Sequence, residues 1–187
     1  MQKHLVIFVK APIMGRVKTR LAKGIGRVAA WRFYKNTVRG LLKRVTRGKW
    51  KTTLYVSPDD YQGSFFPRGI DMIPQGRGDL GQRMQRVFDE MPTGPIVLIG
   101  GDIPTIEKHH IMRAFNALKT NEVVFGPAED GGYWLVGMRR TGNRIAPFEN
   151  VRWSTVHTLK DTFENIDPNT RIAFIDTLND VDTVDDL

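Results

Sequence analysis

Short runs rich in valine and isoleucine alternate with helix-like segments along the chain, and this alternation limits its fold more than any other feature. Apolar runs of strand length occupy 4–10, 52–57, 70–75, 95–102, 122–126, 133–138 and 171–176. Apolar residues at helical spacing predict helices over 27–47, 79–90, 105–119, 155–164 and 181–187, the last capped by Asp180 or Asp182. Between the first strand and the first helix, 11–26 is expected to be a loop with room for one turn of helix. Strands that alternate with helices predict a three-layer α/β/α domain around a mainly parallel, Rossmann-like sheet.

The length of the chain points to one domain over 1–187, because a single core serves chains of up to roughly 250 residues. The chain contains no cysteine, which excludes a disulfide framework, thiolate catalysis and thiolate metal sites. Its apolar runs fall far short of the ~20 residues that a membrane span needs. The N-terminus has the wrong shape for a signal peptide, so we expect a cytoplasmic protein.

Charge is distributed unevenly along the chain. Residues 1–51 contain 15 lysines and arginines and no acid, whereas 161–187 contain eight acids and one arginine. A basic half suits polyanions, either nucleic acid or the phosphates of a small nucleotide. An acidic end can supply metal ligands or form a solvated face, and composition alone does not choose between these functions.

Ligands of open α/β sheets bind beyond the carboxyl ends of the strands, so the loops that follow residues 10, 102, 126 and 176 are the candidates. The first loop holds Gly15, which lets the backbone approach a ligand, and four cations that can neutralise a diphosphate. These cations are Lys10, Arg16, Lys18 and Arg20. The loop is not a Walker A loop, because Val17 stands where that motif demands glycine. A solvated basic loop is the simpler alternative.

The pattern G-x-G-x-x-A at 24–29 matches a dinucleotide fingerprint. It lies a whole loop away from the strand, so we expect its glycines to shape the entry to the helix instead.

The second candidate loop begins with Asp102, after a buried aliphatic run. A carboxylate at the carboxyl end of a central strand is well placed to hold a metal that binds phosphates. The alternative role is a helix N-cap, but Thr105 already serves as a cap candidate, so we favour the metal. One acid of 180–186 could complete this metal site, while Asp185 and Asp186 are expected to cap the last helix or face solvent.

The third candidate is the acid pair Glu129 and Asp130, which precedes two glycines and two aromatic residues. As site residues these acids could meet a sugar or acceptor hydroxyl, and we predict that they carry the catalytic role. A plain hairpin turn is the alternative, because Asp-Gly is a common hairpin signal. His109 and His110 are expected to point apart on a helix, so a shared metal is not expected there.

Six short motifs follow one another in a characteristic order. They are Lys10-Ala-Pro with Gly15 and Lys18-Thr-Arg-Leu, Gly78-Asp-Leu-Gly-Gln-Arg-Met, Gly101-Asp-Ile-Pro, Gly126-Pro-Ala-Glu-Asp-Gly-Gly-Tyr-Trp, Trp153-Ser-Thr and Asp180-Val-Asp-Thr. In this set the chain resembles the nucleotide-diphospho-sugar transferase superfamily, which has the glycosyltransferase A-type (GT-A) fold. Within it, the chain is similar to small bacterial transferases related to phospholactate and molybdenum-cofactor guanylyltransferases.

The resemblance implies that the first loop binds the phosphates of a nucleotide. The residues we predict to bind the nucleotide or its phosphates are Lys10, Ala11, Gly15, Arg16, Lys18, Arg20, Asp79 and Arg83. The resemblance also implies that Asp102 binds Mg²⁺ or Mn²⁺, with Asp182 as the second ligand. Sugar transferases of this fold usually carry Asp-x-Asp at that place, and the single Asp102 is more similar to the nucleotidyltransferases. Those enzymes, however, usually have a more glycine-rich first loop.

Three functions therefore remain open. The first is a metal-dependent transferase that moves a sugar from a nucleotide sugar to a small-molecule acceptor. The second is a nucleotidyltransferase, similar to guanylyltransferases, that joins a nucleoside triphosphate to a phosphorylated acceptor. The third is a basic nucleic-acid-binding module, which we do not favour because no recognition helix or stacking platform is evident. The oligomeric state stays open.

Overall fold

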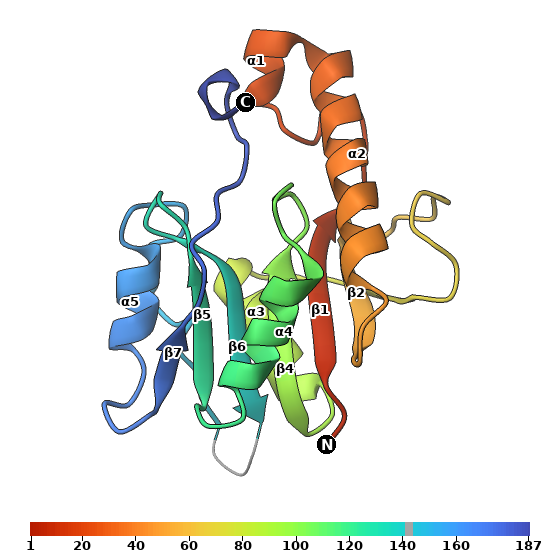
Figure 1. The fold of residues 1–187 in the computed structure, drawn as a ribbon. Helices are drawn as coiled ribbons and strands as arrows, with labels where there is room; N and C mark the ends of the chain where they lie inside the picture. The colour runs from red at the N-terminus through yellow and green to blue at the C-terminus, as the bar shows by residue number, and fades with distance from the viewer. Residues whose placement is uncertain (141–143) are drawn as a thin grey trace.

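The computed structural model describes residues 1–140 and 144–187, and a seven-stranded sheet forms its centre (Figure 1). The strands are β1 (His4–Lys10), β2 (Lys51–Ser57), β3 (Asp71–Pro74), β4 (Gly94–Gly100), β5 (Val123–Pro127), β6 (Tyr133–Arg140) and β7 (Ile172–Phe174). The helices are α1 (Leu21–Ile25), α2 (Arg27–Val45), α3 (Leu80–Glu90), α4 (Lys108–Ala117), α5 (Thr158–Glu164) and the 3₁₀ helix η1 (Val184–Asp186).

The order of the strands in the sheet is β3-β2-β1-β4-β6-β5-β7. All the neighbouring pairs are parallel except the two that involve β6, which is antiparallel to β4 and to β5. The mainly parallel α/β sheet predicted from the sequence is therefore confirmed. Because only β6 is reversed, the other strands all end at one edge of the sheet, and β6 begins there.

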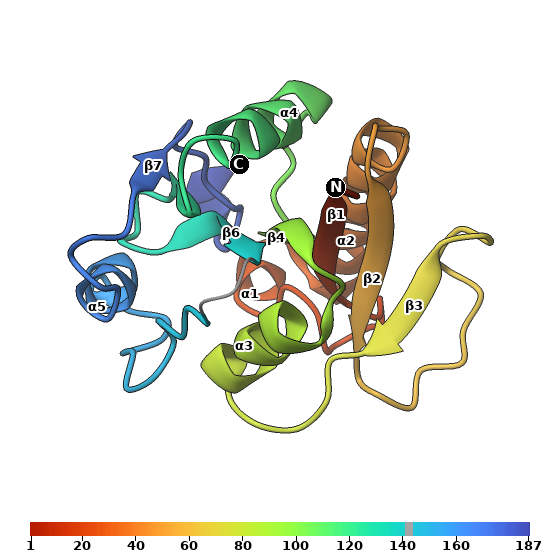
Figure 2. The same cartoon turned by 90° about the horizontal axis from the view of Figure 1, so that it is seen from below.

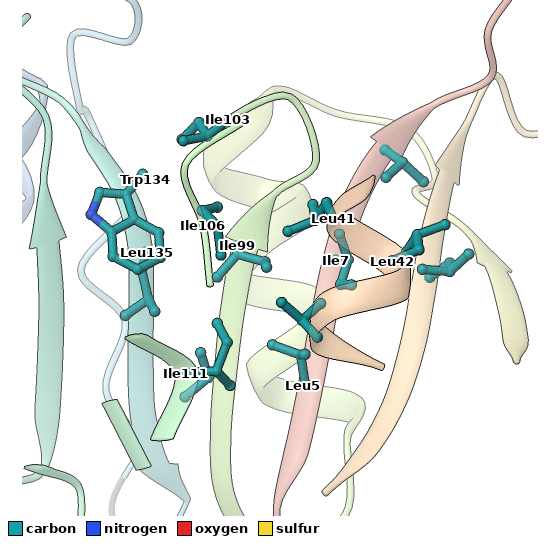
Figure 3. Close-up of a cluster of buried hydrophobic side chains, with 14 of the residues drawn as sticks. Leu5, Ile7, Leu41, Leu42, Ile99, Ile103, Ile106, Ile111, Trp134 and Leu135 are labelled. Atoms are coloured by element: carbon teal, nitrogen blue, oxygen red, sulfur yellow. The ribbon is translucent and has the colours of Figure 1, made fainter. Parts of the chain in front are cut away.

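Helices cover both faces of the sheet, which gives the predicted three layers (Figure 2). On one face, α2 and α4 pack against alternate residues of β1 and β4, among them Leu5, Ile7 and Ile99 (Figure 3). On the other face, α3 and the chain around α5 cover the intervening residues, such as Val6 and Leu98. Side chains of a strand alternate between faces, so these near-continuous apolar runs supply both cores.

The predicted element boundaries are confirmed for most strands and wrong for several helix starts. Helix α4 begins at Lys108 instead of residue 105, because its N-cap is Glu107, not Thr105, and the backbone of Glu107 is hydrogen-bonded to His110. Helix α5 begins at Thr158 instead of 155. The expected closing helix over 181–187 shortens to η1, and its cap is Thr183 instead of Asp180 or Asp182. Helix α1 is the turn of helix that was expected within 11–26.

No helix among residues 1–140 and 144–187 is long and apolar enough to cross a membrane.

Candidate functional site

Four loops from distant parts of the sequence meet at the carboxyl edge of the sheet. They follow β1, β4, β5 and β7, as the sequence predicted. At their meeting point the carboxylates of Asp102, Asp180 and Asp182, which we call the acid cluster, offer oxygen atoms that all lie within 4.8 Å of one another. The ammonium of Lys18 lies among them, with its Nζ 2.9, 3.2 and 2.8 Å from oxygens of Asp102, Asp180 and Asp182.

Lys18 is the buried member of this group. Its side chain is only 3% exposed, whereas those of the three aspartates are 37–41% exposed. Arg20 lies at the rim, with Nη1 3.4 Å from Oδ2 of Asp182. The arrangement is therefore a fixed cation enclosed by three carboxylates that still reach solvent.

The C-terminal segment reaches this edge by crossing over the sheet to α1 (Figure 1). Val181 is buried against Leu21 and Ala30, so it anchors the chain between the two aspartates of the segment. Helix α1 also lets η1 approach closely, because a Cβ atom on Gly24 would lie 2.0 Å from Cγ2 of Val184. Gly26, the other glycine of 24–29, directly precedes α2 and has a φ of +84°, which agrees with the expectation that these glycines shape the entry to the helix.

The first loop is held by Tyr34 of α2. Its hydroxyl accepts a hydrogen bond from the backbone N–H of Lys10 at 3.0 Å and donates one to the carbonyl of the same residue at 2.8 Å. Farther along the loop, Gly15 (φ +80°) and Lys18 (φ +46°) have left-handed backbone conformations. This conformation is uncommon for a residue other than glycine and is found preferentially at functional sites.

The loop that carries Asp102 is fixed on both sides. Gly101 donates its N–H to the carbonyl of Phe8 at 2.9 Å, and a Cβ atom at Gly101 would lie 2.4 Å from Cγ1 of Val9. On the far side, Arg44 donates hydrogen bonds to the carbonyls of Pro104 and Ile106. Because Glu107 caps α4, Asp102 is free of the capping role that was its alternative.

The acid cluster shifts the pKa of its own members. Burial alone would lower the pKa of Lys18, but the charges of Asp102 and Asp180 and the hydrogen bonds to Asp182 and Asp102 outweigh burial and raise it. Burial raises the pKa of Asp180 to about 6, and the neighbouring aspartates add to that shift against the effect of Lys18. The pKa of Asp182 is lowered, since hydrogen bonding and attraction to Lys18 exceed the effect of burial.

The donor set of the acid cluster fits a divalent cation. Mg²⁺ and Mn²⁺ prefer carboxylate oxygens, and these three carboxylates converge while keeping a path to solvent. Asp180 joins the predicted ligands Asp102 and Asp182. The cluster is thus able to hold a metal, and Lys18 is the cation that a metal would have to displace from it.

Beside the acid cluster lies a cavity of about 250 Å³, which we call the chamber. It opens between β4, β6, α3 and the segment before α5, and Asp102, Asp130 and Asp180 are the acids in its wall. Asp130 sits in the turn between β5 and β6, where its Oδ1 accepts a hydrogen bond of 2.9 Å from the N–H of Gly132. The segment with Asp130 is therefore a hairpin turn, as one interpretation of the sequence had it, and it also lines the chamber, as a site residue would.

The remaining predicted residues lie around these two features, and their roles stay predictions. Asp79 caps α3 by accepting a hydrogen bond from Gln82 N. Arg83 donates to the carbonyl of Gly78 at 2.8 Å and so holds the preceding loop. Glu129 is exposed, and its backbone N–H donates a hydrogen bond of 2.9 Å to Oδ1 of Asn179.

In the first loop, Ala11 is buried and its N–H donates to the carbonyl of Ser57. Arg16 is exposed, and so is the side chain of Lys10. The structure therefore brings Lys18, Arg20, Asp102 and Asp182 together, whereas Arg16 and Lys10 are exposed and Ala11 is held through its backbone.

The histidine pair differs from its expectation. The rings of His109 and His110 do not point apart, since their centroids lie 3.9 Å from each other. His110 Nδ1 accepts a hydrogen bond from the N–H of Glu107, so that ring belongs to the cap of α4. In the part of the chain that the structure describes, only the acid cluster gathers three possible metal ligands.

Several residues of the site were not assigned from the sequence. Tyr34, which holds the first loop, was predicted from its helical spacing only to be a core residue. Trp153, Ser154 and Thr158 line the chamber, and Ser154 also has a left-handed backbone with φ +58°. For Trp153 and Ser154 the only signal was the short motif that begins at Trp153, and Thr158 lies outside that motif.

A profile of the protein family described as "Uncharacterized protein conserved in bacteria (DUF2064)" matches residues 41–155. No curated protein matches the chain significantly.

A solved structure of a candidate nucleotide-diphospho-sugar transferase from Desulfovibrio desulfuricans G20 superposes with a TM-score of 0.90. Its sequence identity is 29%, and the match covers 98% of this chain and 84% of that one. The structure of 4-diphosphocytidyl-2C-methyl-D-erythritol synthase from Anaerococcus prevotii DSM 20548 has a TM-score of 0.56 at 10% identity, covering 99% of this chain and 94% of that one.

A manganese complex of Rv0371c from Mycobacterium tuberculosis H37Rv has a TM-score of 0.53 at 18% identity, covering 100% of this chain and 96% of that one. At these identities the last two structures establish a shared fold and nothing further. The predicted superfamily fold is confirmed.

Proposed function

Since the chain belongs to the bacterial family described as DUF2064 and has the fold of the nucleotide-diphospho-sugar transferases, we propose that it is a metal-dependent transferase with a nucleotide-activated donor. A nucleotide sugar is the first candidate for that donor. The observation that carries the proposal is the meeting of Lys18 and Arg20 with the acid cluster at the carboxyl edge of the sheet.

The first loop is suited to the phosphates of the donor. Lys18 and Arg20 supply two positive charges, and charge-assisted hydrogen bonds to phosphate are among the strongest in proteins. Lys18 forms ion pairs with all three acids of the acid cluster, so its charge is held at the site instead of lying in solvent. These two residues stabilise the negative charge that develops on the departing diphosphate.

Asp102, Asp180 and Asp182 are the residues that would hold Mg²⁺ or Mn²⁺. A divalent ion bound there supplies further positive charge for the phosphates of the donor.

Asp130 is the residue best placed to act on the acceptor. It lines the chamber, and the N–H of Gly132 fixes one of its carboxylate oxygens. The other oxygen can accept a hydrogen bond from an acceptor hydroxyl, orient it, and take its proton as the new bond to the sugar forms. Glu129, the second predicted catalytic acid, lies outside the lining of the chamber among the described residues, so we give it the lesser role.

Nucleotidyl transfer is the second candidate, because one aspartate stands where sugar transferases of this fold usually have Asp-x-Asp. The products separate the two reactions. Sugar transfer releases a nucleoside diphosphate, whereas nucleotidyl transfer from a triphosphate releases pyrophosphate.

The binding experiment uses Asp102→Asn with Asp185→Asn as its matched control, because Asp185 is an exposed acid of the same segment as two cluster members. Uridine and guanosine diphosphates are titrated by calorimetry with Mn²⁺, with Mg²⁺ and without metal. We expect metal-dependent nucleotide binding in the parent and in Asp185→Asn, and its loss in Asp102→Asn. Unchanged binding in Asp102→Asn would show that the acid cluster is not the metal site.

A further inference from the structure

Helices α2 and α4 cover one face of the sheet, and their charged side chains are all basic (Figures 1 and 2). Helix α2 contains six lysines and arginines, helix α4 contains two, and neither contains an aspartate or a glutamate. The helices of the opposite face, α3 and α5, together contain three such cations and four acids. Among these four helices, the excess of positive charge is therefore confined to one face of the protein.

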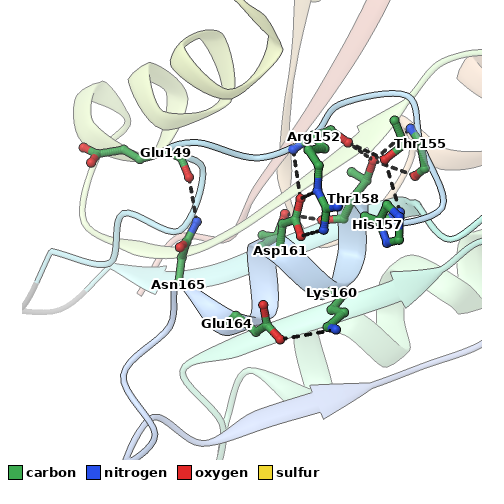
Figure 4. A network of polar contacts seen from close by, with 10 residues as sticks. Glu149, Arg152, Thr155, His157, Thr158, Lys160, Asp161, Glu164 and Asn165 are labelled. Carbon is green, nitrogen blue, oxygen red and sulfur yellow. Dashed lines mark hydrogen bonds and ion pairs between the residues drawn. The ribbon is translucent and has the colours of Figure 1, made fainter.

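The charges around α5 neutralise one another. Arg152, which precedes the helix, forms a two-pronged ion pair with Asp161, with Nη2–Oδ1 at 2.7 Å and Nε–Oδ2 at 2.8 Å (Figure 4). Within the helix, Nζ of Lys160 lies 3.8 Å from Oε1 of Glu164. The face that holds α5 therefore presents paired charges of both signs to solvent.

The cations of α2 and α4 differ in this respect. Arg44 pairs with Glu107 at 3.0 Å, and Arg113 pairs with Asp176 at 2.6 Å. The other six form no ion pair with any residue of 1–140 or 144–187. Four of the six share one side of α2 and a fifth begins α4, and we call these five residues the basic face. They are Arg32, Lys35, Arg39, Lys43 and Lys108.

The spacing of its cations along the sequence creates the basic face. Arg32, Lys35, Arg39 and Lys43 follow one another at intervals of three, four and four residues, which places them on one side of a helix. All four are exposed except Lys35, which is half-buried. Like charges at these intervals repel one another and weaken a helix. An anionic partner would replace this repulsion with attraction.

Two apolar side chains stand among these cations. Val28 lies one helical turn before Arg32 and is 48% exposed, and Met112 lies one turn after Lys108 and is 49% exposed. Membrane-surface helices combine these two properties, because their cations attract anionic lipids and their apolar side chains enter the headgroup region. The surface formed by α2 and α4 therefore has the chemistry of a membrane-binding face.

The shape of this surface suits a membrane better than a nucleic acid. The cations of α2 span about 16 Å along the helix, and α4 packs beside α2 in the same layer (Figure 2). Among the described residues, no helix projects from this layer to enter a groove. The rings of Trp31 and Phe65 are half-buried and already contact Lys35 and Arg39, at 4.0 and 5.1 Å from the ring centroids, so they are poor platforms for stacked bases.

From this combination we propose that the basic face binds peripherally to a bilayer that contains anionic phospholipids. Its cations meet the negative headgroups, Val28 and Met112 enter the headgroup region, and the face of α3 and α5 points to solvent. Each lysine or arginine near such a surface strengthens binding by about fivefold, so five cations supply up to about a thousandfold. The attachment is reversible, and it does not depend on the proposed function.

The test is co-sedimentation of the full-length protein with sucrose-loaded vesicles. Vesicles of phosphatidylcholine alone are compared with vesicles that also contain about one-third phosphatidylserine, in ~0.1 M salt. We expect the anionic vesicles to bind the protein at least about tenfold more tightly than the neutral ones. Raising the salt to about 0.5 M should release most of the protein, because it shortens the range of the attraction to ~4 Å.

A charge variant assigns the binding to the basic face. Arg32→Gln combined with Lys43→Gln removes two exposed cations. At about fivefold for each charge, we expect binding to anionic vesicles to weaken by at least about tenfold. Arg77→Gln combined with Lys160→Gln is the matched control, because it removes the same charge from exposed residues of the opposite face, where Arg77 precedes α3. The control should bind like the parent, and equal melting temperatures show that both variants are folded.

Three results would overturn the inference: no preference for anionic vesicles, unchanged binding in Arg32→Gln with Lys43→Gln, or an equal loss of binding in the control. Single-stranded and duplex DNA of about 20 nucleotides are then added as competitors, at the same concentration of negative charge as the lipid. We expect most of the protein to stay on the vesicles. Its release by either DNA would overturn the inference in favour of a nucleic-acid surface.

Discussion

Replacing Lys18 with methionine separates the role of its charge from that of its bulk. Methionine fills a similar volume with an unbranched chain but brings no ammonium into the acid cluster. In the absence of a divalent cation, Lys18→Met leaves three carboxylates facing one another without their central counter-charge. We therefore expect the variant to be less stable than the parent without metal and to bind metal more tightly.

The size of the effect follows from burial. Removing one partner of a fully buried ion pair costs about 3–5 kcal/mol. Lys18 is buried, but the three carboxylates are nearly 40% exposed, so water screens part of their repulsion and the expected loss falls to about 2–3 kcal/mol. For a chain of 187 residues, with ~2–4 °C per kcal/mol, the melting temperature should fall by about 4–12 °C.

Metal should reverse that loss. A ligand at 100 times its dissociation constant stabilises the folded state by about 2.7 kcal/mol, which is close to the expected deficit. In the parent a metal must displace the ammonium, whereas in Lys18→Met it enters an unbalanced cluster. We expect the affinity for Mn²⁺ to rise by at least about tenfold in the variant, or ~1.4 kcal/mol.

The assay is thermal unfolding in a Mn²⁺ titration, with Lys23→Met as the control because Lys23 is an exposed lysine of α1. The control should follow the parent at every metal concentration. The reasoning is refuted if Lys18→Met melts at the parental temperature without metal. It is equally refuted if Mn²⁺ stabilises the variant no more than the parent, because the ammonium would then not compete for the cluster.

Three further predictions concern the frame around the site. Burial, together with the charge of a nearby lysine, lowers the pKa of His4 from 6.5, so the unfolded chain binds a proton that the folded chain does not as pH falls below that value. His4 should therefore contribute a loss of stability from pH 8 to pH 5, and over this range the urea midpoint of His4→Leu should fall less, or rise more, than that of the parent. Gly24→Ala should weaken Mn²⁺ binding in calorimetry by displacing Val184 of η1, two residues after the cluster member Asp182. Tyr34→Phe removes two hydrogen bonds of the first loop and should cost about 1–3 kcal/mol in urea unfolding.

The sheet could be predicted from the sequence because its signals are local. Runs such as 4–10 and 95–102 are apolar on both sides of the strand, and only a sheet with two covered faces buries such runs. Several helix starts could not be predicted as well. Thr105 is a residue type that often caps helices, but the loop after β4 continues to Glu107. Arg44, which belongs to α2, holds this longer loop in place.

The candidate site was predictable in its parts and not in its assembly. Asp102 and Lys18 were each identified from the residues that surround them in the sequence. Asp180, in contrast, lies 162 residues from Lys18, and nothing local says that the chain returns there. Its return depends on Val181, a single apolar residue between two acids, packing against α1 and α2. A tertiary contact made by one apolar residue does not produce a hydrophobic periodicity that could be recognised in the sequence.

The uneven charge of the sequence has a physical explanation in this contact. A basic first loop and an acidic last segment looked like two independent features, one for phosphates and one for metal or solvent. In the folded protein they neutralise each other through Lys18, so the charges needed for a diphosphate and for a divalent cation are both kept at the site without a ligand. A divalent cation must displace Lys18 from the three carboxylates, and a phosphate must draw Lys18 away from them. Each of these ligands therefore frees the group that the other one binds. Metal and donor phosphates should therefore bind with positive cooperativity, in contrast to the independent binding expected of two unconnected charge patches.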